Sequence, residues 1–496
     1  MNTIALSLAI KHGDVNAVKR ILDVDPTIVN SQDRYGRTPL HLSVQSKQEE
    51  IINVLLGHNA DATLQDHNQN TPLHLAAQCY NLKITEILLS YNKTIIDVQN
   101  NMGRTPLHLA LTRLVSSQSV SSLLSTESLK IAQALLTHGA NVNLQDKNGN
   151  TALHYAANHF HHLEVTEILL NHGANVNVQN NVGDTALHRA ARNGLLSTVV
   201  CLLESGANVH LKGQHGNSVL HCAAQGRAPN ERIVEAVLHH GADVNAQNND
   251  GSTPLHHAAE KIYSALPAIQ ALLKYGADIN AYDSRGCTPL SNAILCSSII
   301  NMQTGTPEFL TAHITKLEYS SDKKTNSAGS LTNQQLIQQS STLSEYKLAC
   351  EKELEKLNNI KVGGGKKSML SAFLANTIDD NELSRYINDP TVQKIYECCE
   401  ENFPIYSYDL KKHIDAGSTR NQLLHGALES MDDICKEQPK EHFTESKASW
   451  NVIPPEVKLN ILKHLSNEDL SEIQQNNTSE AKKKDPQPFR SQMHII

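Results

Sequence analysis

The stretch Thr71-Pro72-Leu73-His74-Leu75-Ala76-Ala77 decides the fold, because variants of its first four residues return throughout the first three hundred positions. The motif begins at Thr38, Thr71, Thr105, Thr151, Thr185, Ser218, Thr253 and Thr288. All but one of the intervals between these starts measure 33 to 35 residues. A fixed period in this range predicts a solenoid, in which each unit packs only against its neighbours.

Each period contains the signals for two helices and a closing loop. The Thr-Pro pair begins the first helix, with Thr as the cap and Pro at the first helical position, where no amide is needed. Apolar residues such as Ile84, Leu88 and Leu89 then indicate a second helix. A Gly-Ala-Asx-Val-Asn segment, seen at 139–143, ends the unit, and its glycine suits the left-handed backbone that follows a helix.

The period, the opening tetrapeptide and the closing loop closely resemble the ankyrin-repeat family. The resemblance implies an all-α fold: a solenoid of helix pairs with β-turn hairpin loops over residues 3–300, with about nine units including caps. Residues 4–37 resemble an N-terminal capping unit. The interval of 46 residues between Thr105 and Thr151 predicts a loop or helix extension in the Ser-rich stretch 116–128.

Composition excludes several classes of function. The net charge of −8 provides no cationic surplus for nucleic acid, and no apolar run is long enough to span a membrane. Nine Cys without a Cys-x-x-Cys pair argue for a reducing compartment. The resemblance gives the motif histidines a structural hydrogen-bonding role, so we expect no catalytic residue, metal ligand or cofactor among them.

Ankyrin stacks bind partners through hairpin tips and the concave face of the inner helices. Mapped by position, the target-binding candidates are Arg34, Tyr35, Arg37, His67, Met102, Arg104, Lys147, Val182, Asp184, His215 and Arg285 at the tips and Arg192 on an inner helix. Further inner-helix positions are Gln45, Gln78, Asn158, Gln225 and Glu260. Arg, Tyr and Met are common anchors at protein interfaces, so this surface predicts a protein partner.

The pattern changes after the repeats. Residues 301–343, rich in Ser, Thr, Asn and Gln, predict a linker, and helical spacing predicts a helical spacer domain over 344–440. The Gly-Gly-Gly-Lys-Lys-Ser run at 363–368 fits a phosphate loop poorly, and we interpret it as a flexible break followed by a capped helix near Ser368. An enzyme hidden in 344–440 is an alternative, with Cys398, Cys399 and His413 as its candidate residues.

Residues 450–470 predict an amphipathic helix begun by proline, and a polar tail follows at 476–496. The segment 450–475 resembles the first half of an F-box, as in the PRANC-like ankyrin effectors of poxviruses and obligate intracellular bacteria. The resemblance implies docking to the adaptor subunit of a cullin-RING ubiquitin ligase. The matching residues are Ile453, Pro454, Glu456, Val457, Ile461, Leu462, Leu465, Asp469 and Leu470. The second half of the family pattern is absent, which puts adaptor binding in doubt.

The sequence therefore predicts an effector or adaptor, not an enzyme. Its repeats would bind a host protein, and its F-box-like segment would recruit the host SCF-type ligase. The alternative is an ankyrin scaffold that sequesters a host protein without ubiquitination. Since the apolar stretch 4–10 lacks a preceding basic region, we expect non-classical secretion into the host cell, or synthesis there if the protein is viral. We expect no nucleic-acid partner and no membrane insertion.

Overall fold

The computed structural model describes residues 2–112, 122–158, 163–226, 231–261, 266–300, 305–320, 327–362 and 367–368, with isolated residues between 392 and 471. The described chain divides into two compact units, residues 1–307 with 327–333 and residues 308–326 with 334–496. The secondary structure of the first unit is almost wholly helical, in pairs that follow the sequence period.

The elements have the following bounds: α1 Asn2–His12, α2 Val15–Val24, η1 Pro26–Asn30, α3 Pro39–Gln45, α4 Glu49–Gly57, α5 Pro72–Gln78, α6 Leu82–Tyr91, η2 Lys93–Ile95, α7 Pro106–Thr112, α8 Ser122–Thr137, α9 Ala152–Ala156, α10 Leu163–Asn171, α11 Ala186–Asn193, α12 Leu196–Glu204, η4 Gln214–Gly216, α13 Val219–Gln225, α14 Glu231–His239, α15 Pro254–Ala259, α16 Leu266–Lys274, α17 Pro289–Ile300, α18 Thr306–Ser320, α19 Ala328–Gln339, α20 Ser341–Asn359, β1 Lys361–Val362 and β2 Lys367–Ser368.

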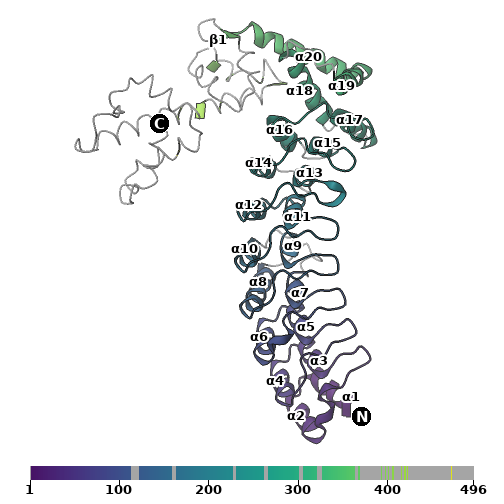
Figure 1. Ribbon diagram of the computed structural model, residues 1–496, viewed down its shortest axis with the longest axis vertical. Helices are drawn as coiled ribbons and strands as arrows, with labels where there is room; N and C mark the ends of the chain where they lie inside the picture. Colours follow the sequence, from purple (N-terminus) through teal and green to yellow (C-terminus); the bar gives the residue numbers. More distant parts are fainter. Residues whose placement is uncertain are drawn as a thin grey trace, which may run out of the picture. The chain divides into compact units, whose positions relative to one another are not determined.

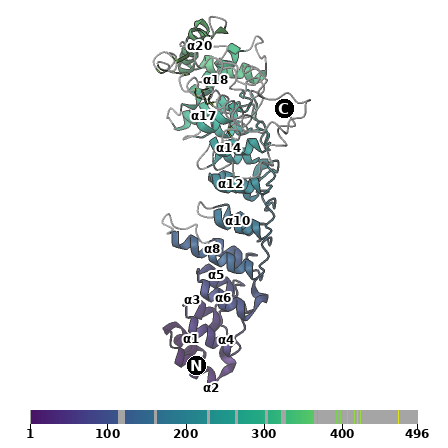
Figure 2. The same cartoon turned by 90° about the vertical axis from the view of Figure 1, so that its left-hand side faces the viewer.

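The helices of the first unit form two columns. The inner helices, from α3 to α15 in odd numbers, pack on one another, and the outer helices, from α4 to α16 in even numbers, do the same. Figure 1 shows the hairpin loops projecting beyond the inner column, and Figure 2 turns the outer column towards the viewer. Buried Leu, Ile, Val and Ala side chains from both columns form the core between them. This arrangement confirms the predicted all-α solenoid.

The motif Thr and His explain why each inner helix begins where it does. In α3, the Thr38 amide donates to Nδ1 of His41 at 3.2 Å, and Thr38 Oγ1 lies 2.8 Å from the same nitrogen. Nδ1 is therefore an acceptor, and Nε2 carries the proton that it donates to the Asn70 carbonyl at 2.9 Å. The imidazole thus caps its own helix and joins it to the next repeat.

Main-chain hydrogen bonds also join successive hairpin tips. The carbonyl of one tip accepts from an amide of the next hairpin, as in Tyr35 to His67 at 3.0 Å and Met102 to Lys147 at 2.9 Å. Glutamine side chains run parallel to this ladder, since Gln32 Nε2 donates to the Gly36 and Gln65 carbonyls. These bonds fix the spacing of the tips along the stack.

The long interval between the third and fourth motifs contains a helix extension. Helix α8 has 16 residues, whereas the other outer helices have 9 or 10. Ser128 lies within α8, is fully buried, and donates to the Ala110 carbonyl of the paired inner helix at 2.7 Å. The inserted residues therefore lengthen the outer helix, as predicted, while residues 113–121 lie outside the described part.

The predicted linker at 301–343 differs from the structure, which has α18 and α19 there. The start of α19 packs on the last repeat. Buried Asn333 accepts from Thr288 Oγ1 at 2.6 Å and donates to Asn280 Oδ1 at 2.9 Å. Any side chain at Gly329 would overlap the Asn280 carbonyl. Residues 327–333 thus close the C-terminal end of the stack, where Ser291 replaces the motif histidine.

The second unit is described from α18 to β2 and at isolated later residues. The Glu353 carboxylate on α20 accepts from the amides of Ile405 and Tyr406, and Tyr406 donates its hydroxyl proton to the Ala312 carbonyl at 3.0 Å. Strands β1 and β2 pair antiparallel, with Lys361 opposite Ser368. Ser368 is therefore in a strand, and the helix predicted to begin near it falls on residues outside the described part, so it stays a prediction.

Candidate protein-binding surface

Eight of the twelve target-binding candidates in the repeats are exposed at hairpin tips. They are Arg34, Tyr35, His67, Met102, Lys147, Val182, His215 and Arg285. Tyr35, Met102 and Val182 are large apolar residues with about half of their surface in solvent. They occupy the same position in three different repeats, so the tip surface offers apolar contacts separated by polar ones.

Three other candidates, Arg37, Arg104 and Asp184, are not free tip residues, and Arg192 lies on inner helix α11 as predicted. In three hairpins the chain reverses at a glycine with positive φ, namely Gly36, Gly103 and Gly183. The next residue has therefore returned beneath the tip, where Arg37 and Arg104 are half-buried and Asp184 is buried. Our assignment of these positions to the tips is corrected accordingly.

Asp184 connects two repeats. Its side chain accepts from Arg192 at 2.6 Å and from the Gln214 amide at 3.0 Å, and the residue is only 3% exposed. Burial raises the pKa of its carboxyl, but the bonds from Arg192 and Gln214 outweigh burial and hold the pKa below its usual value. Asp184 is therefore an ionised structural residue.

The reason for this contact lies at Gly213. In other hairpins an Asx at that position caps the turn with its own side chain, as Asp33 does for the amides of Tyr35 and Arg37. Gly213 has no such side chain, and a Cβ there would meet Asp184 Oδ1 and the His188 ring. The carboxylate from the preceding repeat thus fills the place of the missing Asx.

The two remaining arginines are held in ion pairs below the tips. Arg37 pairs with Asp33 at 2.8 Å and donates to Gln45 at 3.1 Å. Arg104 lies 3.9 Å from Asp146 and over the ring of Tyr155, which donates to Asp146 at 2.6 Å. These groups hold the hairpins against the inner helices.

The inner-helix candidates are all accessible on the face below the tips. Gln45, Gln78 and Gln225 are exposed, and Asn158, Arg192 and Glu260 are half-buried. The structure adds Tyr155 and half-buried Arg189, which donates to Asn150 Oδ1 at 2.6 Å. A helical count from each motif would have placed both residues on this face.

The motif histidines are engaged in structural bonds. Burial lowers the pKa of His74 and His154 to about 4 and of His221 to about 3, against the opposing effect of their bonds to backbone carbonyls. Within the described ranges, no group of three or more His, Cys, Asp or Glu side chains is arranged to hold a metal ion. Nor is any described helix both long and apolar enough to cross a lipid bilayer.

The predicted adaptor-binding residues, from Ile453 to Leu470, lie outside the described residues. The same is true of Cys398, Cys399 and His413, which the alternative enzyme hypothesis singled out. The structure therefore leaves both of these assignments as predictions.

Two family profiles match the chain. The profile of ankyrin repeats (3 copies) matches residues 1–66, 58–128, 122–213, 187–283 and 220–302, which together cover more than half of the sequence. The profile of the PRANC domain matches residues 364–475. The second match begins inside the predicted helical spacer and includes the whole F-box-like segment.

Similar proteins include several from fowlpox virus (strain NVSL). Ankyrin repeat protein FPV232 is 32% identical over 127 residues, which are 25% of this chain and 24% of the relative. FPV219 is 27% identical over 35% of this chain and 36% of the relative. The nuclear factor NF-kappa-B p105 subunit of Gallus gallus is 33% identical over 30% of this chain and 15% of its own.

These matches cover less than half of each relative. Among solved structures, the crystallised ankyrin repeat domain of Bcl-3 is 28% identical with a TM-score of 0.41, over 47% of this chain and 97% of that one. The repeat period, the helix pairs and the profile match agree. The chain belongs to the ankyrin-repeat family, and a PRANC domain follows its repeats.

Proposed function

We propose that this protein is an adaptor that binds a host protein through its ankyrin repeats and presents it to the host SCF-type ubiquitin ligase. Ankyrin repeats are protein-binding modules, and the F-box-like PRANC domain provides the link to a ubiquitin ligase; neither is a catalytic module. The observation that carries the proposal is the presence of both modules on one chain, at 1–302 and 364–475. The chain would hold the target protein close to the ligase, and the recruited complex would transfer ubiquitin.

The repeat surface supports the first half of the proposal. The exposed tips carry Tyr35, Met102, Val182 and several cations, and such aromatic, Met and Arg side chains are enriched in protein interfaces. Most neighbouring tips are held at fixed spacing by main-chain bonds, so little conformational entropy is lost when a partner binds. The target contacts proposed here are Arg34, Tyr35, His67, Met102, Lys147, Val182, His215 and Arg285.

The C-terminal contacts are proposed from the sequence alone. The apolar side of residues 453–470, with Ile453, Val457, Ile461, Leu462 and Leu465, would pack into a groove of the ligase adaptor subunit. Pro454, Glu456, Asp469 and Leu470 complete the F-box-like pattern. The resemblance to fowlpox virus proteins favours synthesis inside the host cell over secretion.

The test is a pull-down of the ligase adaptor subunit by the full chain from eukaryotic cell lysate. The triple variant Ile453→Ala, Pro454→Ala, Leu465→Ala should lose the adaptor. The matched control, Met493→Ala, Ile495→Ala, Ile496→Ala, removes apolar groups outside residues 364–475 and should retain it. If neither the intact chain nor the control binds the adaptor, the ligase proposal is wrong.

Deletion of residues 450–470 separates this function from its rival. An adaptor should lose its effect on the abundance of its target, whereas a scaffold that only sequesters the target keeps its cellular effect.

A further inference from the structure

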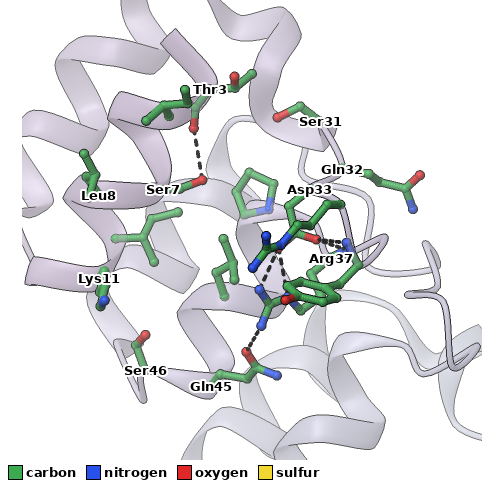
Figure 3. Close-up of a pocket in the computed structure, with 16 residues that line it drawn as sticks. Thr3, Ser7, Leu8, Lys11, Ser31, Gln32, Asp33, Arg37, Gln45 and Ser46 are labelled. Atoms are coloured by element: carbon green, nitrogen blue, oxygen red, sulfur yellow. Dashed lines mark hydrogen bonds and ion pairs between the residues drawn. The ribbon is translucent and has the colours of Figure 1, made fainter. Parts of the chain in front are cut away.

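The N-terminal end of the repeat stack contains a cleft of about 650 Å³. Its walls come from helix α1, the first hairpin and helix α3, as Figure 3 shows. The volume lies within the range of about 300–1,000 Å³ that is typical of ligand pockets. All of its lining residues belong to the first compact unit.

One side of the cleft is apolar and exposed. Ile4 and Leu8 lie one turn apart on α1 and are 67% and 51% exposed, while Leu6 and Ile10 of the same helix are buried. Tyr35, from the first hairpin, is 48% exposed. One face of α1 therefore packs into the core, and its opposite face presents large apolar side chains to the cleft, where no described element covers them.

The other side is cationic. Three cations, Lys11, Arg34 and Arg37, and one carboxylate, Asp33, line the cleft. Burial raises the pKa of Asp33, but its bonds from Arg37 and Tyr35 lower the pKa below the usual value, so its negative charge offsets that of Arg37. Arg34 and Lys11 form no ion pair with any residue that the structure describes.

The aromatic ring fixes the geometry of this charge. The guanidinium groups of Arg34 and Arg37 each lie over the Tyr35 ring, 4.7 Å from its centroid. Arg37 is further held by Asp33 and Gln45, so the ring and its cations are ordered before any partner binds. The local surplus of two positive charges contrasts with the net charge of −8 for the whole chain.

We propose that this cleft binds a peptide segment of the target protein in which an aspartate or glutamate stands next to an aliphatic or aromatic residue. The apolar side chain would lie on Ile4, Leu8 and Tyr35, and the carboxylate would meet Arg34 and Lys11. The proposal rests on the proposed function, and it names the chemistry of the target. Nucleic acid fits less well, because only two cations of the cleft lack an ion pair with a described residue and the chain as a whole is acidic.

The first experiment selects random dodecapeptides displayed on phage against the full chain. The selected peptides should combine an acidic residue with an adjacent apolar one. A synthetic copy should lose at least about tenfold in affinity for the Lys11→Glu, Arg34→Glu variant, because like charges then face each other. Added salt should weaken binding to the intact chain.

The matched control is Lys19→Glu, Arg20→Glu, which reverses two exposed cations on helix α2 of the same repeat unit. It should bind the peptide within about twofold of the intact chain, since the overall charge change is the same but the site differs. Ile4→Ser, Leu8→Ser tests the apolar wall against Val24→Ser, an exposed apolar residue of α2.

The proposal is overturned if no peptide is selected, if the selected peptides lack acidic residues, or if both charge-reversal variants lose binding equally. Displacement of the peptide by a twelve-nucleotide oligo-dT would overturn it in favour of nucleic acid. None of these readouts involves the ligase adaptor, so this inference and the proposed function can fail separately.

Discussion

Replacement of Asp184 by alanine should weaken the junction between its repeat and the next by about 3 kcal/mol. Removing one member of a buried ion pair costs about 3 to 5 kcal/mol. The Arg192 side chain is 34% exposed to solvent, so water screens the charge that the substitution leaves unpaired and reduces this cost to about 2 kcal/mol. Loss of the acceptor for the Gln214 amide adds about 1 kcal/mol. The variant Asp184→Asn keeps an acceptor but no charge, so we expect about 1 to 2 kcal/mol for it.

Native-state hydrogen exchange read by mass spectrometry measures this effect locally. In a repeat stack, stability is a sum of unit terms and nearest-neighbour terms, so the loss should be confined to peptides within residues 185–225. Their opening equilibrium should rise about a hundredfold in Asp184→Ala. Asp250→Ala, at an exposed tip, is the control and should change little. Equal protection in the intact chain and Asp184→Ala would refute the reasoning, as would equal effects of Asp184→Ala and Asp250→Ala.

Two further predictions concern acid and the closing helix. Burial lowers the pKa of all seven motif histidines in the folded chain, to about 4 for His74. Their contribution to stability is therefore complete above the ordinary pKa of 6.5, and it is lost as the pH falls from 6.5 towards the lowered pKa of the folded state. The Tm from differential scanning fluorimetry should therefore fall below about pH 6.5 and fall less steeply in His74→Gln; a flat profile down to pH 5 would contradict this. Gly329→Val should displace the start of α19 and increase the rate of limited proteolysis between residues 300 and 340. The control is Gly57→Ala, where a Cβ meets nothing within 4 Å, and it should leave the digestion rate unchanged. If Gly329→Val and the intact chain are cut at the same rate, the stack is not closed by this contact.

The repeat architecture could be predicted because its signals are local. Thr71 and Pro72 determine the start of α5 within one turn of chain, and the same pair or its variant recurs at every inner helix. The ankyrin assignment and the PRANC-like resemblance are both confirmed by the profile matches. The exposed tips followed from position within the period for the same reason.

Contacts between repeats were harder to predict. Asp184 was assigned to a tip because it precedes the motif Thr185, but its role depends on Arg192 and on the missing side chain at Gly213. The sequence shows that Gly213 stands where the other hairpins have Asx, so a missing turn cap could be predicted there. It does not show which residue replaces that cap. Helix α19 was missed because its Ser, Thr and Gln composition favours a linker, whereas its burial depends on Asn280 and Thr288, about fifty residues earlier.

The cleft was also beyond the sequence analysis, because its walls come from three elements. The sequence shows that Ile4 and Leu8 are apolar, but it does not show that they lie opposite the buried side of α1 and beside the first hairpin. The proximity of Lys11 to Arg34 and Tyr35 requires the folded hairpin.

The main-chain ladder of the hairpin tips is interrupted once among the described residues. From Tyr35 to Asn181 and again from His215 to Ser284, each pair of neighbouring loops shares a backbone bond that survives any change of side chain except a proline at the donor. Between Val182 and Gln214 the loops are joined by the side chains of Gln179 and Asp184. If the tips bind the target as proposed, most of them can vary without loss of a bond between hairpins, whereas a change at Asp184 removes a bond that Gly213 has no side chain to replace. Within the part of the chain that the structure describes, this is the one junction at which a substitution beneath the tips would alter both the proposed target surface and the stability of the stack.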